Sequence, residues 1–214
     1  MHEITLDTLR AALCLPDFDY APAHLAMSPS HRRLPDPTLP PREAGVLALV
    51  YPRAWYGGES LHIVLTRRNE ALRGHSGQIS FPGGKRDPDD PSFVATALRE
   101  TCEELGICGA AVTVLGELNR VYIPPSNFLV TPIVGYMPQE PHFRPNPDEV
   151  AEVFSVPLAQ LLDTQLKRSE ERDVQGVRLQ IPYYALGGHQ VWGATGVMLS
   201  ELEYRLRRVM NAQT

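Results

Sequence analysis

The hydrophobic positions of this chain fall into short continuous runs and into stretches with helical spacing. Continuous apolar runs between turn-forming residues are typical of buried strands. Such runs predict strands over residues 44–52, 61–68, 78–81, 111–118, 130–137 and 149–158, and 177–186 predicts a strand pair or an extended segment. Apolar residues at helical spacing predict helices over 1–15, 92–105 and 191–210, and a short one that ends at 162.

Strands and helices therefore interleave along the chain without a strict repeat. This order predicts an α/β fold in which helices cover a mixed β-sheet. Residues 16–42 are rich in proline and predict an irregular arm, either lying on the domain or mobile. We accordingly expect an N-terminal helix and Pro-rich arm over 1–42 and one main domain over 43–214.

Composition narrows the classes of function. A net charge of −5 and a pI near 5.8 argue against a nucleic-acid binder that works by bulk electrostatics. No apolar run approaches the ~20 residues that span a bilayer, and the first residues lack the pattern of a secretory signal. Three cysteines without a CxxC pair, Cys14, Cys102 and Cys108, predict packed thiols in a reducing compartment. The cytoplasm is the location we expect.

The predicted helix over 92–105 carries a dense acidic cluster. Ser92 is a plausible N-cap, and Gly106 is the expected stop. At about 100° per residue, Glu100, Glu103 and Glu104 fall within one arc of about 100°. The opposite, apolar arc holds Val94, Leu98, Thr101, Cys102 and Leu105. The pattern therefore predicts that the helix buries one face and exposes three carboxylates on the other.

Two interpretations of the acidic face compete. A Glu-rich helix face is most often simply solvated, but such faces usually alternate in sign. Here Arg99 is the only nearby cation, and Pro82-Gly83-Gly84 ahead of the helix lets backbone groups approach a ligand. A hard divalent cation such as Mg²⁺ or Mn²⁺ would relieve the repulsion, because these ions prefer carboxylate and carbonyl oxygens.

At these residues the sequence resembles the Nudix hydrolases. Gly84 opens the family's signature, and Arg99 to Ile107 (RETCEELGI) closes it with every charged and glycine position in place. The middle departs from the pattern, because Asp90 stands where the family has Glu. Eight residues instead of seven separate it from Arg99, and Thr101 replaces an aliphatic residue.

A narrower resemblance accounts for the longer loop. The stretch LTRRNEALRGHSGQISFPGG over 65–84 is similar to the upstream motif of the coenzyme A diphosphatase branch. The matching residues are Leu65-Thr66-Arg67-Arg68, Arg73, Gly77-Gln78 and Phe81-Pro82-Gly83-Gly84. Members of that branch also carry the longer loop with Asp.

The resemblance implies a Nudix-type α/β/α sandwich that hydrolyses the diphosphate bond of coenzyme A or acyl-CoA. The products would be 3′,5′-ADP and 4′-phosphopantetheine or its acyl form. It implies that Glu100, Glu103, Glu104 and the Gly84 carbonyl hold Mg²⁺ or Mn²⁺, while Arg99 orients Glu103 or Glu100. The general base stays open between Glu100 and a later acid, Glu149 or Glu152.

Four further residues are candidates for substrate binding. Arg67 and Arg73 suit phosphate, because a guanidinium binds it bidentately, although both would equally suit a solvated surface. Gln78 either contacts the ligand or braces its loop. His75 would assist the leaving group or only support the loop. Arg68 is expected to face solvent, because it alternates with Arg67 along a strand.

Two rival functions remain. One is a Nudix hydrolase of another nucleoside diphosphate derivative, such as ADP-ribose, NADH or a nucleoside triphosphate. The other is a metal- or nucleotide-sensing module without catalysis. Under each interpretation the partner is a small nucleotide rather than a nucleic acid or a membrane, and the Pro-rich arm is a candidate for contacts in a homodimer.

Overall fold

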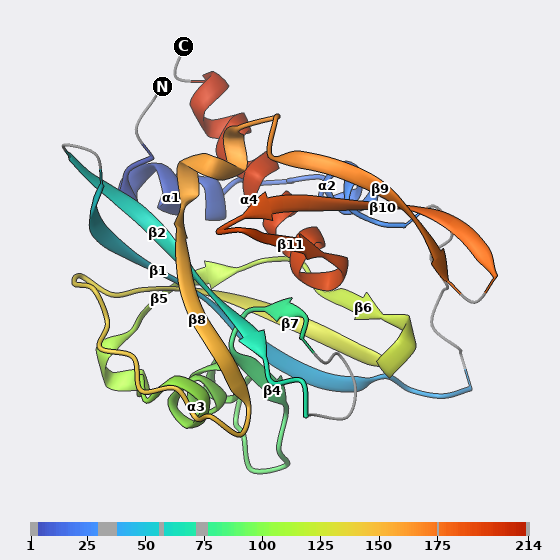
Figure 1. The fold of residues 1–214 in the computed structure, drawn as a ribbon. Coiled ribbons are helices and arrows are strands. Elements are labelled where there is room, and N and C mark those ends of the chain that lie inside the picture. The colour runs from blue at the N-terminus through green and yellow to red at the C-terminus, as the bar shows by residue number, and fades with distance from the viewer. Residues whose placement is uncertain (1–3, 30–37, 56–57, 72–76, 175, 213–214) are drawn as a thin grey trace.

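The structure is a computed structural model that describes residues 4–29, 38–55, 58–71, 77–174 and 176–212 (Figure 1). Strands and helices interleave as the sequence predicts. The helices are α1 (Leu6–Leu13), α2 (Ala21–Ala26), α3 (Phe93–Leu105) and α4 (Gly193–Ala212), with 3₁₀ turns at Gly109–Ala111, Pro124–Ser126 and Leu158–Leu162. The strands are β1 (Arg42–Trp55), β2 (Gly58–Arg68), β3 (Ile79–Ser80), β4 (Gly83–Lys85), β5 (Thr113–Glu117), β6 (Val121–Ile123), β7 (Phe128–Tyr136), β8 (Val150–Pro157), β9 (Lys167–Val174), β10 (Val177–Leu186) and β11 (His189–Trp192).

The main sheet is mixed, which confirms the predicted class. Its central strand is β1, which pairs in parallel with β7 and antiparallel with β2 and β4. Beyond β2 the sheet continues into β3 and β8, and beyond β7 into β5 and β6. The apolar run of β1 follows from this position, because a strand with neighbours on both edges and helices on both faces has little contact with water.

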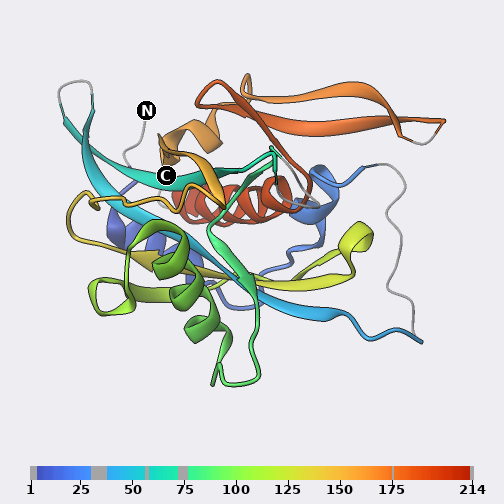
Figure 2. The ribbon, with the colours of Figure 1, turned by 60° about the horizontal axis from the view of Figure 1, so that its bottom comes forward.

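Helices cover the two faces of the main sheet. Figure 2 shows α3 on one face and α4 on the other. Side chains alternate along a strand, so β1 sends Leu47 and Leu49 into a core with Leu105 of α3. It sends Ala48 and Val50 into a second, larger core with α4. The expected α/β/α sandwich is therefore present.

A second sheet lies over α4 on the side away from the main sheet (Figure 2). Its order is β11-β10-β9, and all pairs are antiparallel. The segment 177–186, expected as a strand pair or an extended stretch, is one strand of this sheet. The closing helix begins at Gly193 rather than at 191, because Val191 and Trp192 complete β11 and Gly193 turns the chain with a φ of 63°.

The N-terminal segment packs on the same helix. The predicted first helix is confirmed as α1, whose N-cap Thr5 accepts a hydrogen bond from the Thr8 amide. The expected irregular arm is partly wrong, because residues 21–26 form α2. Both helices contact α4. Residues 30–37 of the arm lie outside the described residues.

Helix α4 is buried along much of its length and carries the charged residues Glu201, Glu203 and Arg205 in the interior. Apolar cores rarely contain such groups unless each charge is paired. Within the described ranges, no helix has both the length and the apolar content needed to cross a membrane.

The cysteine prediction is wrong. Cys102 and Cys108 form a disulfide with their Cα atoms 4.5 Å apart, and Cys14 is an exposed free thiol. The pairing arises because Gly106, at a φ of 71°, ends α3 and turns the chain back beside Cys102. The argument for a reducing compartment from packed thiols therefore has no support.

Candidate active site

The turn into β4 brings bare backbone against the acidic helix. Gly83 has a φ of 145°, and a Cβ there would lie 2.4 Å from the carbonyl oxygen of Gly45 on β1. A Cβ on Gly84 would lie 2.3 Å from Oε2 of Glu100. Only glycine fits at position 83, where backbone blocks a side chain, whereas a side chain at position 84 would have to displace the Glu100 carboxylate. The Glu100 carboxylate occupies the space beside Gly84, and the approach of this backbone to a ligand stays a prediction.

Helix α3 begins and ends as predicted. The Ser92 hydroxyl accepts a hydrogen bond from the Ala95 amide at 3.1 Å, and Gly106 caps the other end in the left-handed region. Two backbone bonds then join this end to a later segment. Arg144 donates to the Leu105 carbonyl at 2.8 Å, and Asn146 donates to the Glu104 carbonyl at 2.8 Å.

The three carboxylates do not share one exposed face, which corrects the sequence prediction. Glu104 is buried at 3% exposure, the Glu100 side chain is 17% exposed, and the Glu103 side chain is 56% exposed. The helical wheel failed for Glu104 because it takes no account of β4. That strand lies over this part of α3, and the Gly83 amide donates to Oε2 of Glu104 at 3.2 Å.

Burial sets the electrostatics of these acids. It raises the pKa of Glu104 to about 7, against the opposing effects of the Gly83 amide and Arg68. Burial also raises the pKa of Glu100, although Arg99 acts in the opposite direction. The charge of Glu149 raises the pKa of both groups further. At both carboxylates, desolvation outweighs the effect of the nearby positive charge.

Arg99 is fixed by acids on two sides. Its Nε and Nη2 donate to the two oxygens of Asp90 at 3.1 and 2.9 Å, and Nη1 donates to Glu100 at 2.9 Å and Glu103 at 3.3 Å. The bonds from Arg99 hold the pKa of Asp90 well below its usual range. Asp90 therefore anchors the arginine of the signature and closes the longer loop, where its Oδ2 also accepts from the Asp87 amide at 3.0 Å.

The donor set suits a hard divalent cation. Within the part of the chain that the structure describes, no three His, Cys, Asp or Glu side chains already converge on one point. Arg99 draws Glu100 and Glu103 together, while Glu104 turns toward Gly83. The carboxylate oxygens nevertheless lie beside a bare backbone turn, and a cation would offset the burial that raises two of their pKa values. The residues present fit the ion.

The two arginines at the end of β2 have different partners, although their side chains are almost equally exposed, at 31% for Arg67 and 30% for Arg68. Arg68 is expected to face solvent, but its Nη1 lies 3.9 Å from Oε1 of Glu104. Arg67 points to the opposite face, where Nε donates to Glu152 at 3.2 Å and Nη1 to Glu70 at 3.4 Å. A register shift between these two positions in the pairing with β8 accompanies this difference.

The other substrate-binding candidates are described only in part. The carbonyl of Gln78 accepts a hydrogen bond from the Arg68 amide at 3.1 Å, so the backbone of Gln78 braces the end of β2. Arg73 and His75 lie outside the described residues.

The two later acids have different surroundings. Glu149 follows a turn in which its amide donates to the Asn146 carbonyl at 3.1 Å, and its Oε1 accepts from Asn146 Nδ2 at 3.3 Å. Glu152 lies between Arg67 and His189. Burial raises its pKa, but the bonds from His189 and Arg67 outweigh that effect and leave the pKa lowered.

His189 makes a contact with a candidate site residue that sequence reasoning missed. Its Nε2 lies 3.3 Å from Oε1 of Glu152, although the two residues are 37 positions apart. No motif or periodic pattern marks it, because the contact exists only when the second sheet folds back onto β8.

Comparison with known proteins gives a consistent result. A family model described as the NUDIX domain matches residues 41–178. A protein of Photorhabdus laumondii called "Uncharacterized Nudix hydrolase NudL" is 39% identical over 145 residues, which cover 68% of this chain and 77% of that protein. A Yersinia pestis protein of the same name is 39% identical over 140 residues, which cover 65% and 70% of the two chains.

Among solved structures, the Nudix hydrolase RenU from M. Smegmatis has 21% sequence identity to this chain and a TM-score of 0.50. The superposition covers 82% of this chain and 89% of that one. At this identity the likeness concerns the fold alone.

Proposed function

This chain belongs to the Nudix hydrolases, which cleave pyrophosphate bonds, and from that premise we propose that its substrate is coenzyme A or acyl-CoA. The products are 3′,5′-ADP and 4′-phosphopantetheine or its acyl form. The stretch from Leu65 to Gly84 supports this choice, because it resembles the upstream motif of the coenzyme A diphosphatases.

One observation carries the catalytic part of the proposal. The buried Glu104 and the half-buried Glu100 are carboxylates with raised pKa values, and they lie against the bare backbone of Gly83 and Gly84. We assign Glu100, Glu103, Glu104 and the Gly84 carbonyl to a site for Mg²⁺ or Mn²⁺. When bound, such a cation neutralises diphosphate charge and makes water more acidic.

Arg99 and Arg68 position this site. Arg99 is locked by Asp90, so it holds Glu100 and Glu103 at fixed places on one side of α3. Arg68 lies near Glu104 and partly offsets its charge. The two arginines thereby orient the carboxylates that we assign to the cation.

Glu149 is the better candidate for the general base. Its charge acts on both Glu100 and Glu104, and its Oε1 is oriented by Asn146. In this role Glu149 takes a proton from the attacking water at Oε2. Glu152 is less suitable, because Arg67 and His189 occupy its oxygens and lower its pKa.

The substrate is tested with a panel of diphosphates. Purified protein is assayed with CoA, acetyl-CoA, dephospho-CoA, ADP-ribose, NADH and a nucleoside triphosphate, each with Mg²⁺ and with Mn²⁺. We expect kcat/KM to be highest for the CoA compounds, with 3′,5′-ADP as the product from CoA. Cleavage of ADP-ribose with CoA and dephospho-CoA untouched contradicts the proposed substrate.

The base is tested with two isosteric variants in the same assay. Glu149→Gln removes the proton acceptor and is expected to lower kcat by about 10²-fold to 10⁴-fold. Glu152→Gln is the matched control and is expected to leave kcat within a few-fold of the parent value. A larger loss of kcat in Glu152→Gln would reverse the assignment.

A further inference from the structure

Two turns meet beside the acids of α3, one after β2 and one before β8. The ladder of β2 and β8 ends with Arg68 opposite Val150. The next residue, Asn69, continues it, because its amide donates to the Glu149 carbonyl at 2.8 Å. The side chain of Asn69 adds a second bond, in which Nδ2 donates to the Pro147 carbonyl at 2.7 Å. Asn69 therefore holds the turn before β8 with both its backbone and its side chain.

The side chain of Asn69 is oriented by its own turn. Its Oδ1 accepts a hydrogen bond from the Ala71 amide at 3.0 Å, which is the local turn that asparagine favours. This bond fixes the side-chain amide so that Nδ2 meets the Pro147 carbonyl. Because an amide side chain carries both an acceptor and a donor, Asn69 serves the two turns at once.

The other side of the turn before β8 is attached to α3. The Asn146 amide donates to the Glu104 carbonyl at 2.8 Å. The Asn146 carbonyl accepts from the amides of Glu149 at 3.1 Å and Val150 at 2.8 Å. Nδ2 of Asn146 also donates to Oε1 of Glu149 at 3.3 Å. The 146–149 turn is thus held between the end of α3 and the end of β2.

This double attachment places Glu149 beside the acidic site. Glu104 is the residue of α3 to which the turn is bonded. Arg68, which precedes Asn69, has its Nη1 3.9 Å from Oε1 of the same Glu104. The charge of Glu149 acts on Glu104 and on Glu100, and it raises the pKa of both. Asn69 is therefore bonded directly to the segment that brings the proposed base to the proposed cation ligands.

We propose that Asn69 is a positioning residue for the reaction: its side chain holds the 146–149 turn and so sets where the Glu149 carboxylate meets the attacking water. The inference rests on the proposed function, in which Glu149 is the general base. A base must lie within hydrogen-bond reach of the proton that it takes. A displaced turn therefore lowers kcat, while groups that bind the substrate stay in place. The stretch 65–84 then serves catalysis as well as substrate recognition.

A double-mutant cycle tests this role. Asn69→Ala removes the bond to Pro147 and is expected to lower kcat about tenfold with KM within about twofold, because the turn is released and the acids of α3 are untouched. Adding Asn69→Ala to Glu149→Gln should lower kcat no further, since Asn69 acts only through Glu149. Additive losses of kcat, or a parent kcat in Asn69→Ala, overturn the proposal. A raised KM at the parent kcat assigns Asn69 to substrate binding and also overturns it.

Two further variants separate the bond to Pro147 from other effects. Asn69→Asp keeps an oxygen for the Ala71 amide but has no donor for the Pro147 carbonyl. Its kcat should fall at least as far as that of Asn69→Ala, and a parent kcat would reject the bond as the cause. Asp148→Ala is the control within the turn, because Asp148 is exposed and takes part through its amide, which donates to Asn146 Oδ1 at 3.1 Å. It should leave kcat unchanged.

Hydrogen exchange gives a readout that needs no substrate. In Asn69→Ala, the protection factors of the Asn146, Glu149 and Val150 amides should fall several-fold, because a turn released on one side opens more often. The Ala95 amide, which bonds to the cap at the other end of α3, should keep its protection. Unchanged protection of the turn overturns the proposal.

Failure of the proposed function is visible separately. If another diphosphate is cleaved in place of CoA, the substrate assignment fails and the cycle is run with that diphosphate. If Glu149→Gln keeps the parent kcat, the base assignment fails and the positioning role fails with it. If Glu149→Gln loses kcat and Asn69→Ala does not, the base stands and only the positioning role is rejected. If no diphosphate is cleaved, the exchange of the turn amides decides.

Discussion

Helices α3 and α4 both carry buried glutamates, but these glutamates differ in how many hydrogen-bond donors surround them. On α4, Glu201 is fully buried and lies 2.8 Å from His24 Nε2, while Asn119 Nδ2 and Arg205 Nε each donate to it at 2.9 Å. On α3, Glu104 is almost as deeply buried, yet it has one amide at 3.2 Å and one guanidinium at 3.9 Å.

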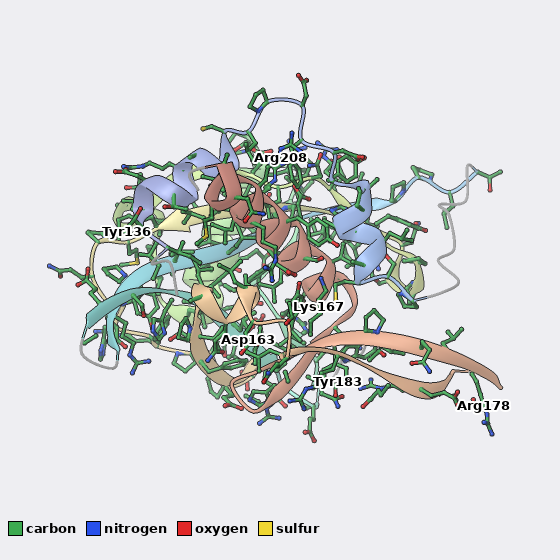
Figure 3. All side chains as sticks on the ribbon, turned by 90° about the horizontal axis from the view of Figure 1, so that it is seen from above. Tyr136, Asp163, Lys167, Arg178, Tyr183 and Arg208 are labelled. Carbon is green, nitrogen blue, oxygen red and sulfur yellow. A yellow bond between two sulfur atoms is a disulfide. The ribbon has the colours of Figure 1, made fainter. Side chains whose placement is uncertain are left out.

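Glu203 repeats the α4 pattern. It accepts hydrogen bonds from Lys167 at 2.9 Å and Arg207 at 2.8 Å, and from the Tyr184 hydroxyl. Figure 3 shows Lys167 beside α4, near the start of the strand pair whose far tip carries Arg178. Burial raises the pKa of Glu203, but these donors outweigh it and leave the pKa lowered.

The difference separates a structural acid from a functional one. Hydrogen-bonding partners from α2, the segment of Asn119, β9, β10 and α4 itself surround Glu201 and Glu203, so their buried charges are paired in the folded chain. Glu100 and Glu104 are left with too few donors, so burial dominates and their pKa values rise. A carboxylate that lacks enough donors within the protein is suited to bind a cation, which would compensate its charge.

The largest expected effect is on turnover. Glu104→Gln preserves the shape of the side chain but removes a proposed cation ligand, and we expect kcat to fall by about 10³-fold, since metal ions contribute several kcal/mol to such reactions. The folded state should not be weakened, because a neutral amide is cheaper to bury than a charge. A variant with parent kcat in the diphosphate assay would remove Glu104 from the site.

The second test removes a structural acid of α4 instead of a proposed cation ligand of α3. Glu201→Ala leaves His24 and Arg205 buried without their partner, and we expect the free energy of unfolding to fall by about 3–5 kcal/mol. Urea denaturation gives this value. The kcat per folded molecule should stay at the parent level, and a loss of kcat without a loss of stability would contradict the comparison.

The third test uses pH and metal-free protein. The folded-state pKa of Glu104, about 7, lies above the ordinary 4.5, so its contribution to stability is complete below pH 4.5 and is lost as pH rises through 7. We expect the free energy of unfolding to fall by about 3 kcal/mol across that window. Urea titrations from pH 5 to 8 measure it.

Two controls frame the pH test. Glu104→Gln should flatten that slope, and Mn²⁺ added at pH 8 should restore stability to the parent protein. Glu201 and Glu203 should change the free energy of unfolding with pH in the opposite direction, because their pKa values are lowered. Their stabilisation is complete above the ordinary carboxyl range, and it is lost as pH falls through the folded-state values. A parent protein with no slope between pH 5 and 8 would contradict the account of Glu104.

The smallest expected effect concerns the covalent link at the end of α3. Reduction of the Cys102–Cys108 disulfide, or Cys102→Ser with Cys108→Ser, releases a short loop and should cost about 2 kcal/mol of stability. Thermal melting measures the loss. Cys14→Ser is the control and should melt like the parent, whereas three free thiols in the unreduced protein would show that the link does not form.

The sequence predicts the buried part of the fold well. The strands β1, β2 and β7 follow from continuous apolar runs, and α3 follows from its caps and spacing. Strand β9 was missed because its sequence, KRSEERDV, is almost entirely polar. It exists only because it pairs with β10 along its whole length, and such edge strands have no apolar signal.

The features of the candidate site could likewise be predicted where they depend on local sequence, and could not where they depend on distant segments. Glu100, Glu103 and Glu104 were found because their spacing on one helix is local information. The burial of Glu104, the different partners of Arg67 and Arg68, and the contact of His189 with Glu152 all depend on segments that meet only after folding. No periodicity encodes a contact between β8 and a strand residue 37 positions later.

The docking of α2 bears on how this protein can be shortened. The family match starts at residue 41, which invites expression of a trimmed polypeptide from there. Yet Ile4, Leu9, Ala12 and Met27 belong to the same hydrophobic core as α4, and His24 supplies a partner of Glu201. A version trimmed to the family match would expose this apolar surface to water and leave a buried acid short of a donor, so aggregation in the cell extract is the expected result.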